Sequence, residues 1–359
     1  MEFIPDISNR YKIKTIIGSG GFSQVFKAFD IINNMECALK IIKKLEIEKG
    51  NQMDYMKNSI RREIEIMKIC ECKNVVKIYD SFETKDSFVL VIELCDINLM
   101  DYILKNKEYI RNIYFLQSIF LDLNNAFNVL NHNKIIHRDI KPENIFLKFE
   151  GNKIIPKLGD FGISRTYKEA NNKEDKDYDI NSYNSYHTNI YTNQMGTLNY
   201  MAPEVLKGET YNYKCDLYSL GVTLYKLFFL KYPFDGHTLL SILNNINKKK
   251  KLFLKSGLKS FDDLLEGLLK IDPTERLTME DYLNHPFFKE DKNLLKKCKF
   301  ESKTIINDKE KEKNEQINKI DNIAKNMFDI MRLSNIYIEK IPKIANILYY
   351  DENINEYLD

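Results

Sequence analysis

The interpretation of this chain rests on the stretch HRDIKPEN at residues 137–144, which DFG follows at residues 160–162. A third string, MAPE, stands at residues 201–204. All three lie in or beside a loop-rich region, residues 141–204, with long helical patterns on either side. We interpret the charged side chains of the first two strings as candidates for binding phosphate.

Upstream of these strings, residues 11–95 are dominated by short runs rich in Ile, Val, Phe and Tyr. The runs are YKIKTIIG, QVFKAFD, ECALKII, VVKIYDSF and SFVLVIEL, and they predict a small antiparallel sheet. One segment differs. In residues 53–69 the apolar side chains Met56, Ile60, Ile64 and Met67 recur at helical spacing. The sheet is therefore expected to carry one helix.

The glycine-rich stretch GSGGFSQV, residues 18–25, lies between the first two predicted strands. Taken alone it fits a tight turn, and its place between strands argues against a dinucleotide-binding fold. Without Cβ atoms, its backbone amides could approach phosphate oxygens. Lys40 follows on the next strand, and Glu63 lies on the predicted helix. Lys40 is either a solvated lysine or, paired with Glu63, a fixed positive charge for phosphates.

Downstream of residue 99, long helical patterns predominate. They are NLMDYILKNKEYI (98–110), RNIYFLQSIFLDLNNAFNVLN (111–131), LYSLGVTLYKLFFL (217–230) and SFDDLLEGLLKI (260–271). The second unit is therefore predicted to be mostly α-helical. Residues 167–194 form a polar tract that we expect to be mobile.

Composition limits the classes of function. The 359 residues carry 54 Lys+Arg and 52 Asp+Glu, a formal charge of +2. This balance does not favour a nucleic-acid partner. The most apolar stretch, 217–230, is interrupted and short of the ~20 residues of a membrane span, so none is expected. The start predicts no secretion, and six cysteines without a C-x-x-C pair predict reduced thiols in the cytoplasm, with the nucleus left open.

Together, the glycine-rich stretch, Lys40, HRDIKPEN, DFG and MAPE resemble the catalytic core of eukaryotic protein kinases. The resemblance covers about residues 11–289. It implies an α+β, two-lobed fold with a small antiparallel β lobe carrying one helix and a larger, mostly α lobe. Lys141, two residues after Asp139, is typical of the serine/threonine branch. The strings GSGGFSQVFKA, VIELC and MGTLNYMAPEVL resemble both the calcium/calmodulin-dependent and the autophagy-initiating groups of this family.

The resemblance divides the chain. We predict an N-terminal lead (1–10), an N-lobe (11–95), a C-lobe (96–290) and a tail (291–359). An activation segment, 160–204, would contain the polar insert 167–194. In the tail, an apolar stripe at helical spacing predicts a helical C-terminal extension: Ile317, Ile320, Ala324, Met327 and Met331. The alternatives for the tail are packing against the C-lobe and a partner or autoregulatory contact.

The same resemblance implies phosphoryl transfer from ATP to Ser or Thr of protein substrates. Asp139 would accept or orient the substrate hydroxyl proton, and Lys141 would neutralise the transferring γ-phosphate. Lys40, fixed by Glu63, would anchor the α- and β-phosphates. The alternative is a pseudokinase or scaffold that keeps the fold without catalysis.

Metal and nucleotide ligands are implied in the same way. Asn144 and Asp160 would hold Mg²⁺, or Mn²⁺ in its place. Residues 93–95 would form the hinge, with Ile92 as gatekeeper. The ATP-binding set would comprise Gly18, Ser19, Gly20, Gly21, Phe22, Ser23, Val25, Ala38, Lys40, Ile92, Glu93, Cys95 and Phe146.

Supporting residues complete the implied site. Asp216 would steady the catalytic loop, and Glu204 would pair with Arg276. A stack linking the N-lobe helix to DFG would contain Met67, Ile78, His137 and Phe161.

Regulation is implied by Arg138, which stands beside Asp139. In this type of kinase, Arg–phosphate pairs order the activation loop. Thr192 is the first candidate phosphosite, with Thr188 and Tyr191 as rivals. Thr197 is expected to contact the catalytic loop instead.

Overall fold

The computed structural model describes residues 9–20, 23–44, 50–167, 197–236, 238–248 and 254–291, with backbone alone at 50–53 and 55. The chain forms two units, residues 1–300 and 301–359. Every described residue belongs to the first unit. The predicted tail helix, the phosphosite candidates and nearly all of the polar insert lie outside the described residues.

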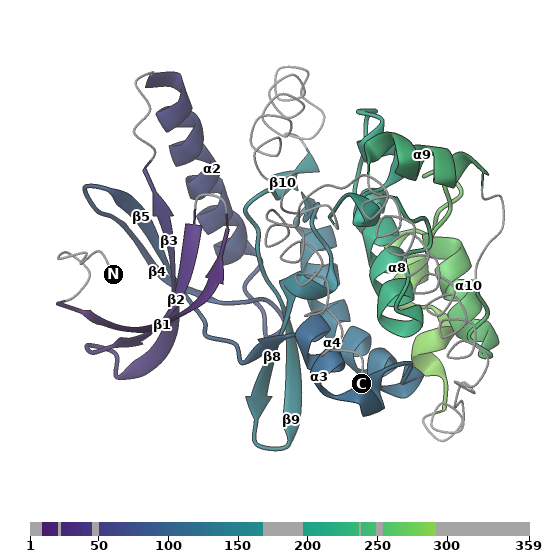
Figure 1. The fold of residues 1–359 in the computed structure, drawn as a ribbon, viewed down its shortest axis with the longest axis horizontal. Helices are drawn as coiled ribbons and strands as arrows, with labels where there is room; N and C mark the ends of the chain where they lie inside the picture. Colours follow the sequence, from purple (N-terminus) through teal and green to yellow (C-terminus); the bar gives the residue numbers. More distant parts are fainter. Residues whose placement is uncertain are drawn as a thin grey trace, which may run out of the picture. The chain divides into compact units, whose positions relative to one another are not determined.

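The N-lobe is the predicted small antiparallel sheet with one helix (Figure 1). Its five strands are β1 (Tyr11–Ser19), β2 (Ser23–Asp30), β3 (Met35–Lys43), β4 (Ile78–Glu83) and β5 (Ser87–Ile92), in the order β1-β2-β3-β5-β4. The helix α2 (Gly50–Ile69) buries Met56 and Ile60 against Phe88 and Leu90 of β5. Its apolar residues thus face the sheet, as their spacing predicts.

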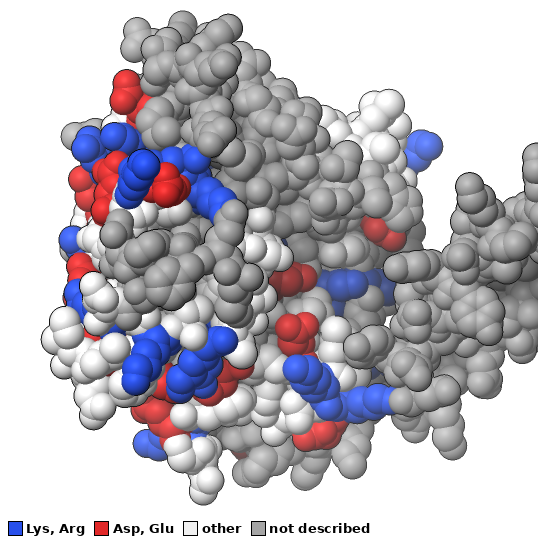
Figure 2. Space-filling view, turned by 60° about the vertical axis from the view of Figure 1, so that its left-hand side comes forward, with Lys and Arg blue, Asp and Glu red and all other residues white. Residues whose placement is uncertain are grey.

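Charged side chains of both signs alternate on the N-lobe face shown in Figure 2. Lys14 and Lys27 both pair with Glu36, at 2.6 and 2.9 Å. Lys44 of the same lobe pairs with Glu83 at 2.8 Å. The exposed pairs that Lys14 and Lys27 form with Glu36 contribute little to stability, so the sheet is held mainly by its buried apolar residues.

The C-lobe is mostly helical, as predicted (Figure 1). Its helices are α3 (Leu99–Lys105), α4 (Ile113–His132), α7 (Pro203–Leu206), α8 (Lys214–Phe229), α9 (Leu239–Lys248), α10 (Lys259–Leu268) and α11 (Met279–Leu283). Short 3₁₀ turns are η1 (Lys107–Tyr109), η2 (Pro142–Asn144), η3 (Thr197–Tyr200) and η4 (Pro286–Lys289). Helix α8 is buried along almost its whole length, so it forms the centre of the lobe's core.

Two sequence-based expectations need correction. The pattern at 98–110 predicted one helix, but Asn106 ends α3 and a separate turn, η1, follows. The loop-rich region 141–204 was given no strands from the sequence, yet it contains the hairpin β8 (Ile145–Glu150) and β9 (Lys153–Leu158). Gly151, with φ of +58°, supplies the left-handed turn residue between the two strands. The turn sequence EGNK was the available signal.

The hairpin joins other short strands. β6 (Ile97–Asn98) pairs with β8 to complete a three-stranded sheet, order β6-β8-β9. β7 (Ile135–Ile136) pairs with β10 (Arg165–Thr166). These strands bracket the HRDIKPEN and DFG strings, so the loops that carry the charged residues are tied down at both ends.

The predicted pair of Glu204 and Arg276 is confirmed. The Arg276 guanidinium lies 2.7 Å from Glu204 Oε1 and 3.0 Å from Oε2, and it is buried. It also donates to the carbonyl oxygens of Lys214 and Lys270. The pair connects the MAPE string to the loop after α10.

We expect Arg276→Ala to lower the free energy of unfolding by about 3–5 kcal/mol, because it leaves the Glu204 carboxylate buried without its partner. Urea denaturation measures the change. Lys270→Ala is the matched control, since it removes only an exposed 3.9 Å contact with Glu266. The control should cost about 0.3–0.5 kcal/mol. Equal losses in the two variants would contradict the assignment.

Candidate active site

The backbone of the HRDIKPEN loop is held by one carboxylate. Asp216 Oδ2 accepts the N–H of His137 at 2.7 Å, and Oδ1 accepts the N–H of Arg138 at 2.8 Å. Arg138 has φ of +71°, a conformation that a non-glycine residue keeps only where its surroundings enforce it. Burial raises the pKa of Asp216, which the donors around it partly oppose. The expected role of Asp216 in steadying this loop is thus seen in its contacts.

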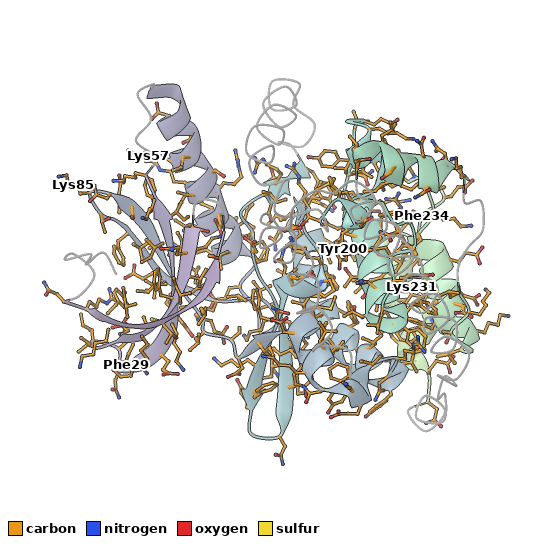
Figure 3. The ribbon with its side chains drawn as sticks, viewed as in Figure 1. Phe29, Lys57, Lys85, Tyr200, Lys231 and Phe234 are labelled. Carbon is orange, nitrogen blue, oxygen red and sulfur yellow. The ribbon has the colours of Figure 1, made fainter. Side chains whose placement is uncertain are left out.

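Two further polar residues on α8 support the same region. Ser219 Oγ donates to the carbonyl oxygen of Tyr200 at 2.8 Å, and Thr223 Oγ1 donates to that of Ile140 at 3.2 Å. Asp216, Ser219 and Thr223 are all buried, and their spacing places them along one helix face. Tyr200, labelled in Figure 3, also packs its ring on Tyr232 at 5.4 Å.

Sequence analysis found Asp216 but missed Ser219 and Thr223. The available signal was a row of polar residues at i, i+3 and i+7 in a helix that is otherwise apolar. In such a helix each polar side chain needs a buried partner, because an unpaired one is costly. The partners here are the catalytic loop and the segment before MAPE.

Asp139, Lys141 and Asn144 form one hydrogen-bonded cluster. Lys141 Nζ lies 2.8 Å from Asp139 Oδ2, and Asn144 Nδ2 donates to the same oxygen at 2.8 Å. Asn144 Nδ2 also donates to the Asp139 carbonyl oxygen. Lys141 Nζ approaches Thr197 Oγ1 at 3.4 Å, the contact expected of Thr197. The Asp139 carboxylate is therefore held in one orientation.

The DFG aspartate lies beside this cluster. The N–H of Gly159 donates to the Asn144 carbonyl oxygen at 2.9 Å, which fixes the residue before Asp160 against η2. Lys40 Nζ on β3 lies 2.7 Å from Glu63 Oε1 on α2 and 3.2 Å from Asp160 Oδ1. The predicted Lys40–Glu63 pair is thus formed, and it extends to Asp160.

Lys40, Glu63 and Asp160 each stabilise the charged form of a neighbour in this set. Burial alone would lower the pKa of Lys40, but the Glu63 and Asp160 carboxylates outweigh it and hold that pKa above its ordinary value. The Lys40 ammonium in turn is the main reason that the pKa of Asp160 lies below its ordinary value. At neutral pH, Lys40 is therefore a cation and Asp160 an anion.

His137 connects the two loops. Its Nδ1 accepts the N–H of Asp139 at 3.3 Å, which assigns the proton to Nε2, and Nε2 donates to the Gly159 carbonyl oxygen at 3.1 Å. The His137 and Phe161 rings lie edge to face at 4.8 Å. Met67 and Phe161 belong to one buried cluster, and Ile78 packs against it. The His137–Phe161 contact agrees with the predicted stack, and Met67 and Ile78 belong to the same core.

Three of the residues expected around the adenine ring, Val25, Ala38 and Ile92, lie on the neighbouring interior strands β2, β3 and β5. Val25 is the register partner of Lys40, and Ala38 that of Ile92. Phe146 lies on β8, and its ring is so close to Gly159 that an added Cβ would meet it at 2.9 Å. The N–H of Gly20 donates to the Ser23 carbonyl oxygen, so a hydrogen bond closes the glycine-rich turn between β1 and β2. Gly18 and Ser19 end β1; Gly21 and Phe22 lie outside the described residues.

A comparison with known families agrees with this geometry. The family described as the protein kinase domain matches residues 11–288. The chain belongs to this family. The match spans both lobes and every loop described above.

The relatives of this kinase domain include a serine/threonine-protein kinase, a carbon catabolite-derepressing protein kinase and a calcium-dependent protein kinase. Serine/threonine-protein kinase TIO of Arabidopsis thaliana is 31% identical over 280 residues, covering 78% of this chain and 19% of TIO. The carbon catabolite-derepressing protein kinase of Candida glabrata is 29% identical, covering 78% and 42%. Calcium-dependent protein kinase 3 of Plasmodium yoelii yoelii is 29% identical, covering 81% and 50%.

The kinase domain thus spans between a fifth and a half of the length of these relatives. Among the residues that the structure describes, no helix is both long and apolar enough to cross a membrane.

At the hinge of the kinase domain, sequence analysis missed two lysines. Glu93 pairs with Lys148 of β8 and with Lys157 of β9, at 2.8 and 2.9 Å. Neither lysine belongs to a recognised string, so no local signal marked them. Cys95 is half-buried, and burial raises the pKa of its thiol to about 12. It is therefore a neutral thiol at neutral pH.

We expect Gly159→Ala to destabilise the kinase domain by about 1–3 kcal/mol, because the new methyl group would overlap the Phe146 ring and Val76. Denaturant unfolding measures this loss. The double variant Gly159→Ala with Phe146→Leu should lose less than the sum of the single variants, since Leu removes the obstructing ring atoms. Additive losses would show that the Phe146 contact is not the cause.

Proposed function

We propose that the chain is an active serine/threonine protein kinase that transfers the γ-phosphate of ATP to proteins and requires Mg²⁺. The observation that carries the proposal is the Lys40 ammonium, which lies within 3.2 Å of both Glu63 and Asp160. It joins a residue of β3, one of α2 and one of the loop after β9. Two Arabidopsis thaliana relatives, TIO and ATG1a, are named serine/threonine-protein kinases, which supports the proposed specificity.

The catalytic chemistry assigns a task to each side chain. Phosphoryl transfer depends mostly on positioning and on stabilising charge spread over phosphate oxygens. The Asp139 carboxylate, oriented by Lys141 and Asn144, would accept or orient the proton of the substrate hydroxyl. Lys141 would also neutralise the transferring phosphate, and Lys40 would anchor the phosphates that remain on the nucleotide.

The residues at the metal position fit Mg²⁺. Mg²⁺ binds oxygen ligands, with one or two carboxylates and substrate phosphates completing its shell. Asp160 supplies an ionised carboxylate. Asn144 uses its amide nitrogen to donate twice to Asp139, so its amide oxygen is the atom suited to a cation. The bound ion would neutralise charge on the phosphates, and Mn²⁺ suits the same oxygen ligands.

The alternative of a pseudokinase or scaffold is less well supported. Such a protein could lack a catalytic group or hold it out of place. Here Lys40, Glu63, Asp139, Asn144 and Asp160 are all present, and each contacts at least one other member of the set.

Regulation by phosphorylation of the activation segment is part of the proposal. Arg138 lies beside Asp139, and Arg165 lies on β10, just after DFG. Guanidinium groups bind phosphate in a bidentate manner, so a phosphate on Thr192, Thr188 or Tyr191 could order the segment there. We also propose a cytoplasmic location, because Cys37, Cys70, Cys72, Cys95 and Cys215 are free thiols.

We expect Asp139→Asn to lower the turnover of phosphate transfer to a generic basic protein by at least about 100-fold, because a general base is lost. Transfer of labelled γ-phosphate, followed by phosphoamino-acid analysis, measures both rate and Ser/Thr specificity. Asp122→Asn, an exposed site on α4, is the control and should keep wild-type turnover. Equal turnover in the Asp139 variant and the wild type would refute the mechanism.

Mg²⁺ is expected to increase the affinity of the chain for ATP. We expect Asp160→Asn to raise, by about tenfold or more, the Mg²⁺ concentration that gives half of this increase, because a carboxylate ligand becomes neutral. Calorimetric titration of ATP at a series of Mg²⁺ concentrations measures this shift without requiring turnover. A Mg²⁺ dependence identical to that of the wild type would exclude Asp160 as a ligand.

A further inference from the structure

At the hinge, the Glu93 side chain is held by two lysines to which the mechanism above assigns no task. Glu93 follows β5 directly, and only 8% of its surface is exposed. Lys148 Nζ lies 2.8 Å from its Oε1, and Lys157 Nζ lies 2.9 Å from its Oε2. The Lys157 side chain is 9% exposed, whereas that of Lys148 is 31% exposed.

Such a cluster requires a reason, because removing charges from water costs several kcal/mol per ion before pairing compensates. Burial alone would raise the pKa of Glu93, but hydrogen bonds from Lys148 and Lys157 hold it below its ordinary value. The same carboxylate keeps the pKa of Lys148 above its ordinary value, against the effect of burial. Buried ion pairs are weak evidence of stability, and fixing one arrangement of the chain is a better-supported use.

The arrangement that is fixed joins three segments. Glu93 forms two hydrogen bonds with the backbone of Lys77. Its N–H donates to the Lys77 carbonyl oxygen at 2.8 Å, and its Oε2 accepts the Lys77 N–H at 3.3 Å. Lys157 Nζ also donates to the Lys73 carbonyl oxygen at 2.8 Å. The cluster therefore ties the hinge to the loop before β4 and to the β8–β9 hairpin.

The hairpin connects the cluster to the nucleotide position. Phe146 is the register partner of Lys157 on β9, and Lys148 follows it by two residues on β8. Directly opposed residues of an antiparallel pair, and residues two apart on a strand, share one face of the sheet. Phe146, the expected floor for adenine, therefore shares a face with both lysines that hold Glu93.

Strand β9 adds a second connection. Lys157 precedes Asp160 by only three residues, and at Gly159, between them, the Phe146 ring occupies the space that a Cβ would need. A shift of the hairpin relative to the hinge would move the adenine floor and Asp160 together.

We propose that Lys148 and Lys157, acting through Glu93, are positioning residues that set the spacing between the hinge and the adenine floor, and so set the affinity for ATP. This inference rests on the proposed nucleotide-binding function of the site. The three side chains hold one another and the backbone, so their effect reaches the nucleotide through the hinge and Phe146.

The test compares Lys157→Met and Lys148→Met with the wild-type chain. The dissociation constant for ATP with Mg²⁺ should rise about tenfold in Lys157→Met, or ~1.4 kcal/mol, and by less in Lys148→Met, because Lys157 is more buried and also holds Lys73. The KM for ATP should rise in parallel, while kcat should stay within about twofold. Lys148→Met keeps the buried pair of Glu93 and Lys157, so it remains informative if Lys157→Met fails to fold.

Lys44→Met is the matched control. Lys44 is also a mostly buried lysine paired with a glutamate, Glu83 at 2.8 Å, but it lies at the far end of β3 from the hinge. The control should lose stability without losing ATP affinity. An equal loss of ATP affinity in Lys44→Met would overturn the inference, since general loosening of the lobe would then explain it.

Unchanged ATP affinity in both folded hinge variants would also overturn the inference, leaving the cluster a purely structural one. Calorimetric titration of ATP does not depend on turnover. A wild-type chain that binds ATP but transfers no phosphate even after its activation segment is phosphorylated would therefore refute the proposed function and still test the hinge.

Discussion

The Asp216 carboxylate accepts the backbone N–H groups of His137 and Arg138, and most of the site depends on this contact. It holds Arg138 in a left-handed conformation that the residue would otherwise avoid. That bend precedes Asp139 by one residue. Because the carboxylate is itself buried on a helix at the centre of the C-lobe core, the backbone that carries Asp139 is anchored to that core.

The second constraint operates between the lobes. Lys40 comes from the sheet, Glu63 from the helix packed on it, and Asp160 from the loop after β9. Each charge offsets the desolvation of the others, so the three groups are most stable when the lobes are apposed. Glu93 at the hinge, paired with two lysines of the β8–β9 hairpin, follows the same principle. Both sets of ion pairs join elements that are far apart in sequence.

Close packing sets a further limit around Phe146. The position of Gly159 requires glycine, because the Phe146 ring and Val76 occupy the space that a Cβ would need. Its backbone N–H and carbonyl oxygen are used as well, by Asn144 and His137 respectively. One residue without a side chain thus allows Asp160, the HRDIKPEN loop and Phe146 to lie close together.

The sequence alone determined the two-lobed α+β fold and nearly every charged residue of the site. Period-two and period-3.6 patterns separate the sheet from the helices, and phosphoryl transfer needs acidic, amide and basic groups that stand in recognisable strings. The sequence did not reveal the β8–β9 hairpin, the Ser219 and Thr223 contacts, or the lysines that hold Glu93. Those features arise from pairing between residues that local patterns treat as ordinary loop, core or surface positions. Only the folded chain decides them, because a buried polar group must find its partner in three dimensions.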